Sequence, residues 1–162
     1  MFIRTAGERD LAAVRDLLAE TWHATYDPLY GVDKVTEITE ARHSVAMLRK
    51  MLARPFSEFV VADSGAGLAG LAHAAMLGEE RQIVELHEFN VRPAMQGKGI
   101  GGLLLEEVEG SFFECRLMRL DVEERNSRAV AFFEAAGFVI AGRGPAKQFV
   151  DATLLTLEKP LA

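Results

Sequence analysis

A short glycine-rich segment offers the clearest chemistry in this sequence, with glycines at positions 97, 99, 101 and 102. It follows an apolar, strand-like stretch that ends at Val91, and it opens a stretch with helical apolar spacing. A helix start presents unpaired backbone N–H groups and the positive end of the helix dipole, so it favours an anion. Glycine lets that backbone approach a phosphate without a Cβ in the way, and Lys98 adds a positive charge. The segment therefore predicts a pyrophosphate-binding loop.

A second segment that could contribute to a functional site runs from Asn126 to Phe138. Asn126 is a favourable N-cap, and the apolar residues after it recur with the period of one helix face. Gly137 stands where a helix C-cap glycine belongs, with Phe138 as its packing partner. This segment predicts a capped amphipathic helix downstream of the glycine loop.

Periodic apolar patterns supply the elements that must position these two segments. We expect strands at 2–4, 59–62, 68–77, 82–91, 116–122, 138–141 and 152–157. Helices are expected at 11–22 and 33–52, separated by a looser stretch at 26–31, and after each of the two segments above. The order β-α-α-β-β-β-α-β-α-β-β predicts a mixed α/β fold in a single domain, residues 1–162.

Composition excludes several classes of protein. A hydrophobic fraction of 49% fits a folded domain, and no apolar run approaches the roughly 18–20 residues of a membrane span. The net charge of −6 argues against a nucleic-acid partner, whose phosphates need clustered basic surface. The lone Cys115 cannot form an internal disulfide, which favours a cytoplasmic location. The histidines show no metal-ligand spacing with one another or with Cys115, so we expect no metal site.

The two segments together resemble the motifs of the GNAT N-acetyltransferase superfamily. The family's phosphate motif is matched by Gln96-Gly-Lys-Gly99-Ile-Gly101, and its downstream motif by the segment from Asn126 through Phe132-Phe133-Glu134 to Gly137-Phe138. The resemblance covers nearly the whole chain, because the order of elements also matches. It implies a GNAT-like single domain with a mixed, mostly antiparallel twisted sheet of about six or seven strands and about four helices.

The resemblance also implies a reaction and a set of binding residues. The chain would transfer an acetyl group from acetyl-CoA to a primary amine of a small molecule or peptide, by direct attack in a ternary complex. Backbone amides around Gly97 to Gly102 would hold the pyrophosphate, and the main chain at Val91 would pair with the pantetheine arm. The implied cofactor-binding residues are Val91, Gln96, Gly97, Lys98, Gly99, Ile100, Gly101, Gly102, Asn126 and Phe133. The resemblance also implies a possible homodimer.

Amine acetylation needs a proton acceptor, because an alkylamine with a pKa near ~10.4 is protonated at neutral pH. Several family members carry a glutamate six residues before the strand-ending aliphatic residue, and that position here is Glu85. Glu85 is therefore the predicted base, with Glu88, His87 and a water relay as alternatives. In a regular strand Glu85, His87, Phe89 and Val91 would share one side, unless a bulge changes that alternation.

Position 133 departs from the family pattern. The family usually carries tyrosine there, as the acid that protonates the leaving thiolate, whereas Phe133 has no hydroxyl. Water, another residue, or Tyr26 and Tyr30 from the stretch between the first helices are the alternatives, so the acid is unassigned.

Two other functions fit part of the sequence. The segment from Gly97 to Gly102 also matches the dinucleotide fingerprint G-x-G-x-x-G, and Asp121 lies about 20 residues further on, as in nicotinamide-dependent oxidoreductases. Against this, five residues, 92–96, separate the strand from the first glycine, and little chain remains for further parallel strands. The Phe133 substitution also leaves open a non-catalytic acyl-CoA-binding module.

Overall fold

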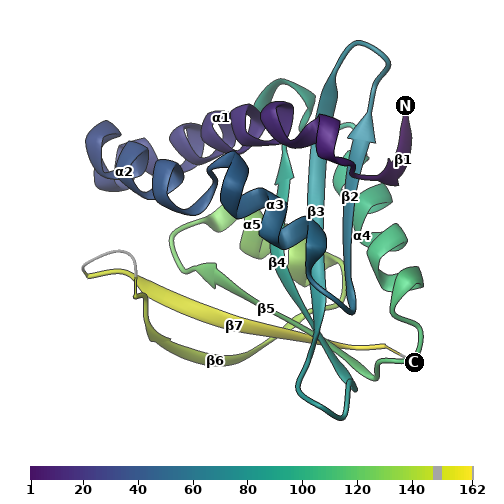
Figure 1. Cartoon of the computed structure of the whole chain (residues 1–162). Coiled ribbons are helices and arrows are strands. Elements are labelled where there is room, and N and C mark those ends of the chain that lie inside the picture. The colour runs from purple at the N-terminus through teal and green to yellow at the C-terminus, as the bar shows by residue number, and fades with distance from the viewer. Residues whose placement is uncertain (148–150, 162) are drawn as a thin grey trace.

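A seven-stranded sheet with helices on both faces forms the body of the protein in the computed structural model, which describes residues 1–147 and 151–161 (Figure 1). Strand order across the sheet is β1-β2-β3-β4-β5-β7-β6. The elements follow one another as β1 (Phe2–Thr5), η1 (Glu8–Asp10), α1 (Leu11–Tyr30), α2 (Val32–Arg42), α3 (Val45–Ala53), β2 (Ser57–Asp63), β3 (Leu68–Leu77), β4 (Ile83–Val91), η2 (Pro93–Met95), α4 (Ile100–Ser111), β5 (Leu117–Glu123), α5 (Ser127–Ala135), β6 (Val139–Pro145) and β7 (Thr153–Pro160).

Every neighbouring pair of strands is antiparallel except β4 and β5. This confirms the predicted mixed, mostly antiparallel sheet. The described residues form five α-helices, one more than the approximate number expected. A doubly wound dinucleotide fold needs a mostly parallel sheet, so the oxidoreductase alternative fails on topology. No helix within the described ranges is both long and apolar enough to cross a membrane.

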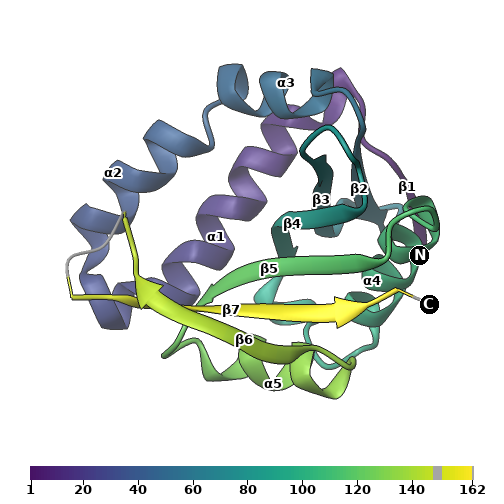
Figure 2. The same ribbon diagram turned by 90° about the horizontal axis from the view of Figure 1, so that it is seen from below.

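Two apolar cores lie on opposite faces of the sheet. On one face, Leu104 and Val108 of α4 and Phe133 of α5 pack against the inner residues of β3, β4, β5 and β7. On the other face, Leu17 and Leu18 of α1 pack with α3 against β2 and β3. Figure 2 shows α1, α2 and α3 on one side of the sheet and α5 on the other. The centre of the sheet is therefore buried on both faces, whereas the edge strand β6 is largely exposed.

The two N-terminal helices expected from sequence are three in the structure. Helix α1 runs on through Pro28 to Tyr30, which corrects the expected break at residues 26–31. Pro28 lies in the last turn, where its missing N–H costs one hydrogen bond near an end that frays in any case. The second expected helix, 33–52, divides into α2 and α3 at His43 and Ser44, and the Ser44 hydroxyl accepts from the Met47 N–H at 3.2 Å.

A bulge in β4 corrects the expected side-chain alternation. Opposite β3, the partner of His73 is Glu88 and the partner of Ala74 is Leu86, so His87 is an extra residue. A bulge of this kind reverses the alternation beyond it. Phe89 therefore packs with Leu86 in the α4 core and not on the side of Glu85. Glu85, Glu88 and Asn90 instead share the side that faces α1.

Strands β4 and β5 separate soon after they meet. Their pairing begins at Ile83 opposite Leu117 and ends at Glu85 opposite Arg119. Beyond that point the two strands diverge in both views (Figures 1 and 2). The remainder of β4, from Leu86 to Val91, thus pairs with β3 on one side and borders an opening on the other.

Close packing of α4 against α5 gives a stability prediction. A Cβ added at Gly101 would lie 2.9 Å from the Phe132 Cε1 atom, whereas one added at Gly110 meets no atom within 4 Å. We expect Gly101→Ala to lower the free energy of unfolding by about 1–3 kcal/mol through overpacking. The same substitution at Gly110, in the same helix, should raise it by up to about 0.5–1 kcal/mol because it removes backbone entropy from the unfolded chain. Urea denaturation measures both, and equal effects would contradict the packing argument.

Candidate active site

Two adjoining cavities occupy the opening between β4 and β5. One, of about 330 Å³, lies between α1, the middle of β4 and the end of β5. The other, of about 470 Å³, lies between β4, the glycine loop and α5. They share a set of lining residues from α1, β4 and α5: Thr21, Thr25, Phe89, Asn90, Asn126, Ala129 and Phe133. The cavities therefore meet at a junction bounded by these three elements.

The larger cavity brings together most of the residues predicted to bind cofactor. Its lining includes Val91, Gln96, Gly97, Gly99, Ile100, Gly101, Gly102, Asn126 and Phe133. Lys98 is exposed in the same loop and is not among the lining residues. Arg128 of α5 is among the lining residues and brings a positive charge to this cavity.

Backbone geometry in the loop requires glycine. Gly97 has a φ of 78° and Gly99 has a φ of 83°, a region that L side chains rarely adopt. A Cβ built at either position meets no atom within 4 Å. Gly99 precedes the first residue of α4, so the unpaired N–H groups of that helix start lie at this cavity. The Gln96 side chain donates to the Val91 carbonyl at 3.1 Å and ties the loop to the end of β4. The loop is thus shaped for an anion that approaches main chain.

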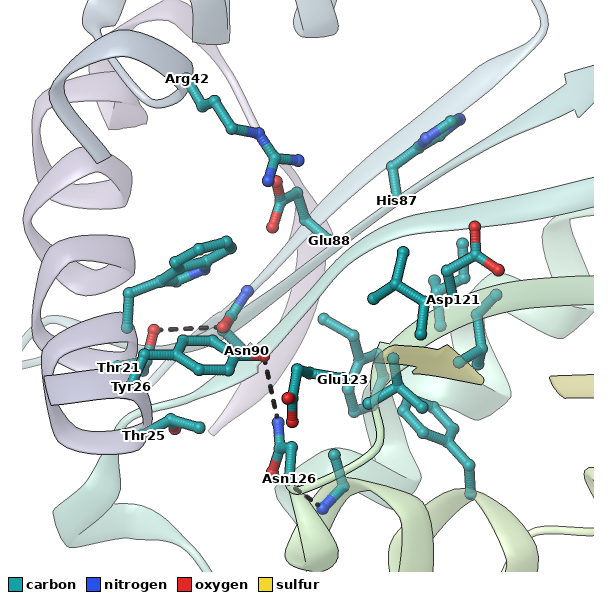
Figure 3. Close-up of a pocket in the computed structure, with 18 of the residues that line it drawn as sticks. Thr21, Thr25, Tyr26, Arg42, His87, Glu88, Asn90, Asp121, Glu123 and Asn126 are labelled. Atoms are coloured by element: carbon teal, nitrogen blue, oxygen red, sulfur yellow. Dashed lines mark hydrogen bonds between the residues drawn. The ribbon is translucent and has the colours of Figure 1, made fainter. Parts of the chain in front are cut away.

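The smaller cavity is rich in carboxylates and aromatic rings. Glu85, Glu88, Asp121 and Glu123 line it together with Trp22, Tyr26 and Arg42. Figure 3 shows Glu88 and Arg42 on one side of this space, with Glu123 and Asn126 on the other. A cavity with this charge and with aromatic walls suits a cationic group.

Two of these carboxylates are buried and held by partners. Glu88 accepts a hydrogen bond from His43 Nε2 at 2.9 Å. Burial raises the pKa of Glu88, but the hydrogen bond and charge of His43, with Arg42 nearby, outweigh it and hold that pKa below its usual value. Glu123 accepts from Tyr30 Oη at 2.9 Å and from Arg125 Nε at 2.9 Å, and its pKa is likewise lowered despite burial. Both carboxylates are therefore ionised and already engaged in hydrogen bonds within the protein.

Glu85 differs from these two because its side chain is 30% exposed and the ionisable group beside it is the His87 ring, with Nδ1 3.4 Å from Glu85 Oε1. Burial lowers the pKa of His87, so the ring is neutral near pH 7. Arg54 Nη1 contacts His87 Nε2 at 3.1 Å. Because the guanidinium can only donate, Nε2 is the acceptor and Nδ1 carries the ring proton toward Glu85. Arg54 thus fixes the orientation of the His87 ring, and the ring N–H points toward the partly exposed Glu85 carboxylate.

Two residues at the junction were not found from sequence, Thr21 and Asn90. The Thr21 hydroxyl donates to Asn90 Oδ1 at 3.1 Å and links α1 to β4 (Figure 3). Nothing in the local sequence signals this pair, because its members are 69 residues apart and the bulge at His87 decides where Asn90 points. By contrast, Asn126 was expected as a cap, and its Oδ1 does accept from the Ala129 N–H at 3.3 Å.

Comparison with known proteins agrees with this geometry. Residues 11–138 match the family model described as the acetyltransferase (GNAT) family. The chain is 36% identical over 98 residues to a curated relative, the N-alpha-acetyltransferase RimI of Mycobacterium tuberculosis, a match that spans 60% of this chain and 61% of the relative.

Solved structures share the fold. The PaiA N-acetyltransferase of Thermoplasma acidophilum in complex with coenzyme A superposes with a TM-score of 0.87, at 22% identity over 98% of both chains. The ribosomal-protein-S18-alanine N-acetyltransferase of Escherichia coli gives a TM-score of 0.74, at 17% identity over 99% of this chain and 94% of that one.

A buried histidine beneath this site gives a pH prediction. Burial and the neighbouring His87 lower the pKa of His73 from 6.5 to about 4. Between these values the unfolded chain binds a proton that the folded protein does not. Stability should therefore fall by about 3 kcal/mol as pH drops from 6.5 to 4, with no further loss from this residue below that. His73→Phe removes this proton uptake and should flatten the slope in that window. Denaturation midpoints across the pH range measure it, and parallel curves would contradict the assignment.

Proposed function

Because this chain belongs to the acetyltransferase (GNAT) family, we propose that it transfers an acetyl group from acetyl-CoA to a primary amine. The observation that carries this proposal is the pair of adjoining cavities, one built on a glycine loop and the other lined by carboxylates. The first suits a phosphate-bearing donor and the second suits a cationic acceptor. The shared junction is where the two substrates would react in a ternary complex.

The larger cavity fits coenzyme A. Main-chain N–H groups from Gly97 to Gly102, at the start of α4, would hold the pyrophosphate, with Gln96 and Ile100 shaping the loop. The edge of β4 that β5 leaves unpaired ends at Val91 and would receive the pantetheine arm as an added strand. Asn126 and Phe133 would border its thiol end. When bound, acetyl-CoA supplies a thioester whose carbonyl carbon an amine can attack.

We propose Glu85 as the base that removes the first proton from the ammonium form of the acceptor. Its carboxylate is partly exposed in the acceptor cavity, whereas Glu88 is buried against His43. Glu85 lies four residues before Phe89 at the junction, and at a strand rise of about 3.3 Å per residue this separation is roughly 13 Å. Because this is too far for direct contact with the reacting amine, Glu85 is proposed to act through water in the cavity. Because the Glu85 side chain is 30% exposed, the proton that it takes up can pass directly to solvent water.

The acceptor is proposed to be a small-molecule or peptide amine. The carboxylates of the smaller cavity support a cationic acceptor, and the similarity to an N-alpha-acetyltransferase supports the amino terminus of a peptide. We further propose a cytoplasmic location, since the one cysteine, Cys115, is buried and has no partner for a disulfide. The homodimer implied by the resemblance stays a prediction.

An acceptor screen tests the proposed activity. Free thiol released from acetyl-CoA is measured with a polyamine, an aminoglycoside, an amino acid and a peptide with a free amino terminus. We expect release that depends on one of these amines. Thermal shifts with acetyl-CoA and with NAD run beside it. Stabilisation by acetyl-CoA without thiol release would indicate a binding module, and stabilisation by NAD alone would contradict the proposal.

Replacing the proposed base tests its role. We expect Glu85→Gln to lower kcat by about 10²-fold and to flatten its rise with pH, while acetyl-CoA affinity stays unchanged, because the amide cannot accept the ammonium proton. Glu80→Gln, on the exposed turn between β3 and β4, removes the same charge away from the cavity and serves as control. A wild-type pH profile in Glu85→Gln would place the base elsewhere, with Glu88 the next position to replace.

A further inference from the structure

The junction of the two cavities has an apolar wall where a proton donor is needed. Phe133 is buried there, with its ring 5.3 Å from Phe89, 5.2 Å from Phe132 and 5.3 Å from Phe138 between centroids. Breaking a thioester leaves a thiolate, and an alkyl thiolate with a conjugate-acid pKa near ~8.5 is a poor leaving group unless it is stabilised or protonated. No atom of Phe133 can donate a proton, so a donor must come from the facing wall.

Helix α1 brings a phenol to that facing wall. Tyr26 lines the acceptor cavity one residue after Thr25, which lines both cavities. Its ring packs beside Trp22, with centroids 4.9 Å apart. Its hydroxyl oxygen lies 3.5 Å from Asn126 Nδ2, across the opening from α1 to the start of α5. Figure 3 shows the ring extending from α1 toward Asn126. The Tyr26 hydroxyl thus reaches the residue at which the two cavities meet.

The cap of α5 fixes the direction of this contact. Asn126 Oδ1 accepts from the Ala129 N–H at 3.3 Å, so the amide nitrogen must face the other way, toward Tyr26. That nitrogen only donates, and the phenol oxygen is therefore the acceptor between them. The phenol proton is not used in this contact with Asn126. The Tyr26 hydroxyl is positioned by the Asn126 side chain, whose orientation is set in turn by the Ala129 backbone N–H.

We propose that Tyr26 protonates the sulfur of the leaving group, in the place of a hydroxyl at position 133. This inference rests on the proposed acetyl transfer. As the carbon–sulfur bond breaks, its electron pair moves to sulfur and the phenol proton of Tyr26 forms the S–H bond. The phenolate regains, through water, the proton that the attacking nitrogen loses as the amide forms. Tyr26 thus ends the cycle neutral, and the first ammonium proton leaves through Glu85.

The surroundings of Tyr26 keep it protonated until that step. Burial raises the pKa of its phenol and outweighs the opposing Asn126 hydrogen bond; the charges of Glu123 and Glu88 raise that pKa further, and the charge of Arg42 opposes them weakly. A phenolate there would also face those two negative charges. The group therefore enters the reaction as a neutral proton donor.

The other tyrosine of this helix, Tyr30, is engaged differently. Its hydroxyl donates to Glu123 Oε1 at 2.9 Å and accepts from Arg125 Nη2 at 2.8 Å. It lines neither cavity. Tyr30 is one helical turn beyond Tyr26 and carries the same side chain, so Tyr30→Phe is a matched control for the loss of a phenol hydroxyl from α1.

Binding measurements test Tyr26 without relying on turnover. Dissociation constants for coenzyme A and for desulfo-coenzyme A, which lacks the sulfur, are measured by calorimetry at a pH above the thiol pKa of about 8.5. Wild type should prefer coenzyme A by about tenfold, the value of a hydrogen bond to a charged group. In Tyr26→Phe this preference should disappear, and in Tyr30→Phe it should remain. An equal preference in wild type and Tyr26→Phe would overturn the inference.

Kinetics supply a second readout. Tyr26→Phe should lower kcat with acetyl-CoA by about 10²-fold. The loss should be smaller with acetyl-seleno-coenzyme A, because a selenol is a stronger acid than a thiol and its anion leaves without protonation. An equal loss with both donors would assign Tyr26 a merely structural role and overturn the inference. Failure of wild type to bind coenzyme A would overturn the proposed function as well, whereas an active wild type with an unaffected Tyr26→Phe overturns the inference alone.

Discussion

The separation of β4 from β5 is the constraint on which the rest of this structure depends. The two strands are parallel and pair only from Ile83 to Glu85, so the outer half of β4 keeps backbone groups without a strand partner on that side. Unpaired backbone groups must be satisfied by solvent or by a ligand. The same separation makes room for the start of α4 on one side and for the end of α1 on the other. Both cavities exist because the sheet opens here.

The bulge at His87 decides which side chains face this opening. Without the extra residue, Phe89 would lie on the side of Glu85, and Glu88 and Asn90 would lie on the opposite face. With it, the acidic and amide side chains turn toward α1 while Phe89 joins the apolar core under α4 and α5. A single inserted residue thus separates a polar acceptor side from an apolar packing side along one strand. Bulges next to functional sites commonly re-aim side chains in this way.

Charge in the acceptor cavity is divided between carboxylates that hold structure and carboxylates left for substrate. Glu88 is paired with His43 and Glu123 with Arg125, and these contacts tie the α2–α3 junction to β4 and the end of β5 to the next loop. Removing one partner of such a buried pair leaves an uncompensated charge, which costs several kcal/mol. Glu85 and Asp121 are more accessible, and Asp121 accepts a hydrogen bond from the Thr156 hydroxyl at 2.7 Å. The paired carboxylates therefore hold the shape of the cavity, and the accessible carboxylates supply negative charge to a substrate.

Sequence by itself determined the local features: the order of strands, the glycine loop before α4, and the Asn126 cap. Each depends on residues within one or two turns of chain, so its signal is present in the linear pattern. It could not decide the end of α1, where packing overrides Pro28, nor the bulge at His87, which depends on register with β3. The continuation of α1 places Tyr26 opposite Asn126, 100 residues away in sequence, and the bulge turns Asn90 toward Thr21. Only the tertiary structure brings such groups together, because contact between distant segments is set by packing and register, which no local pattern encodes.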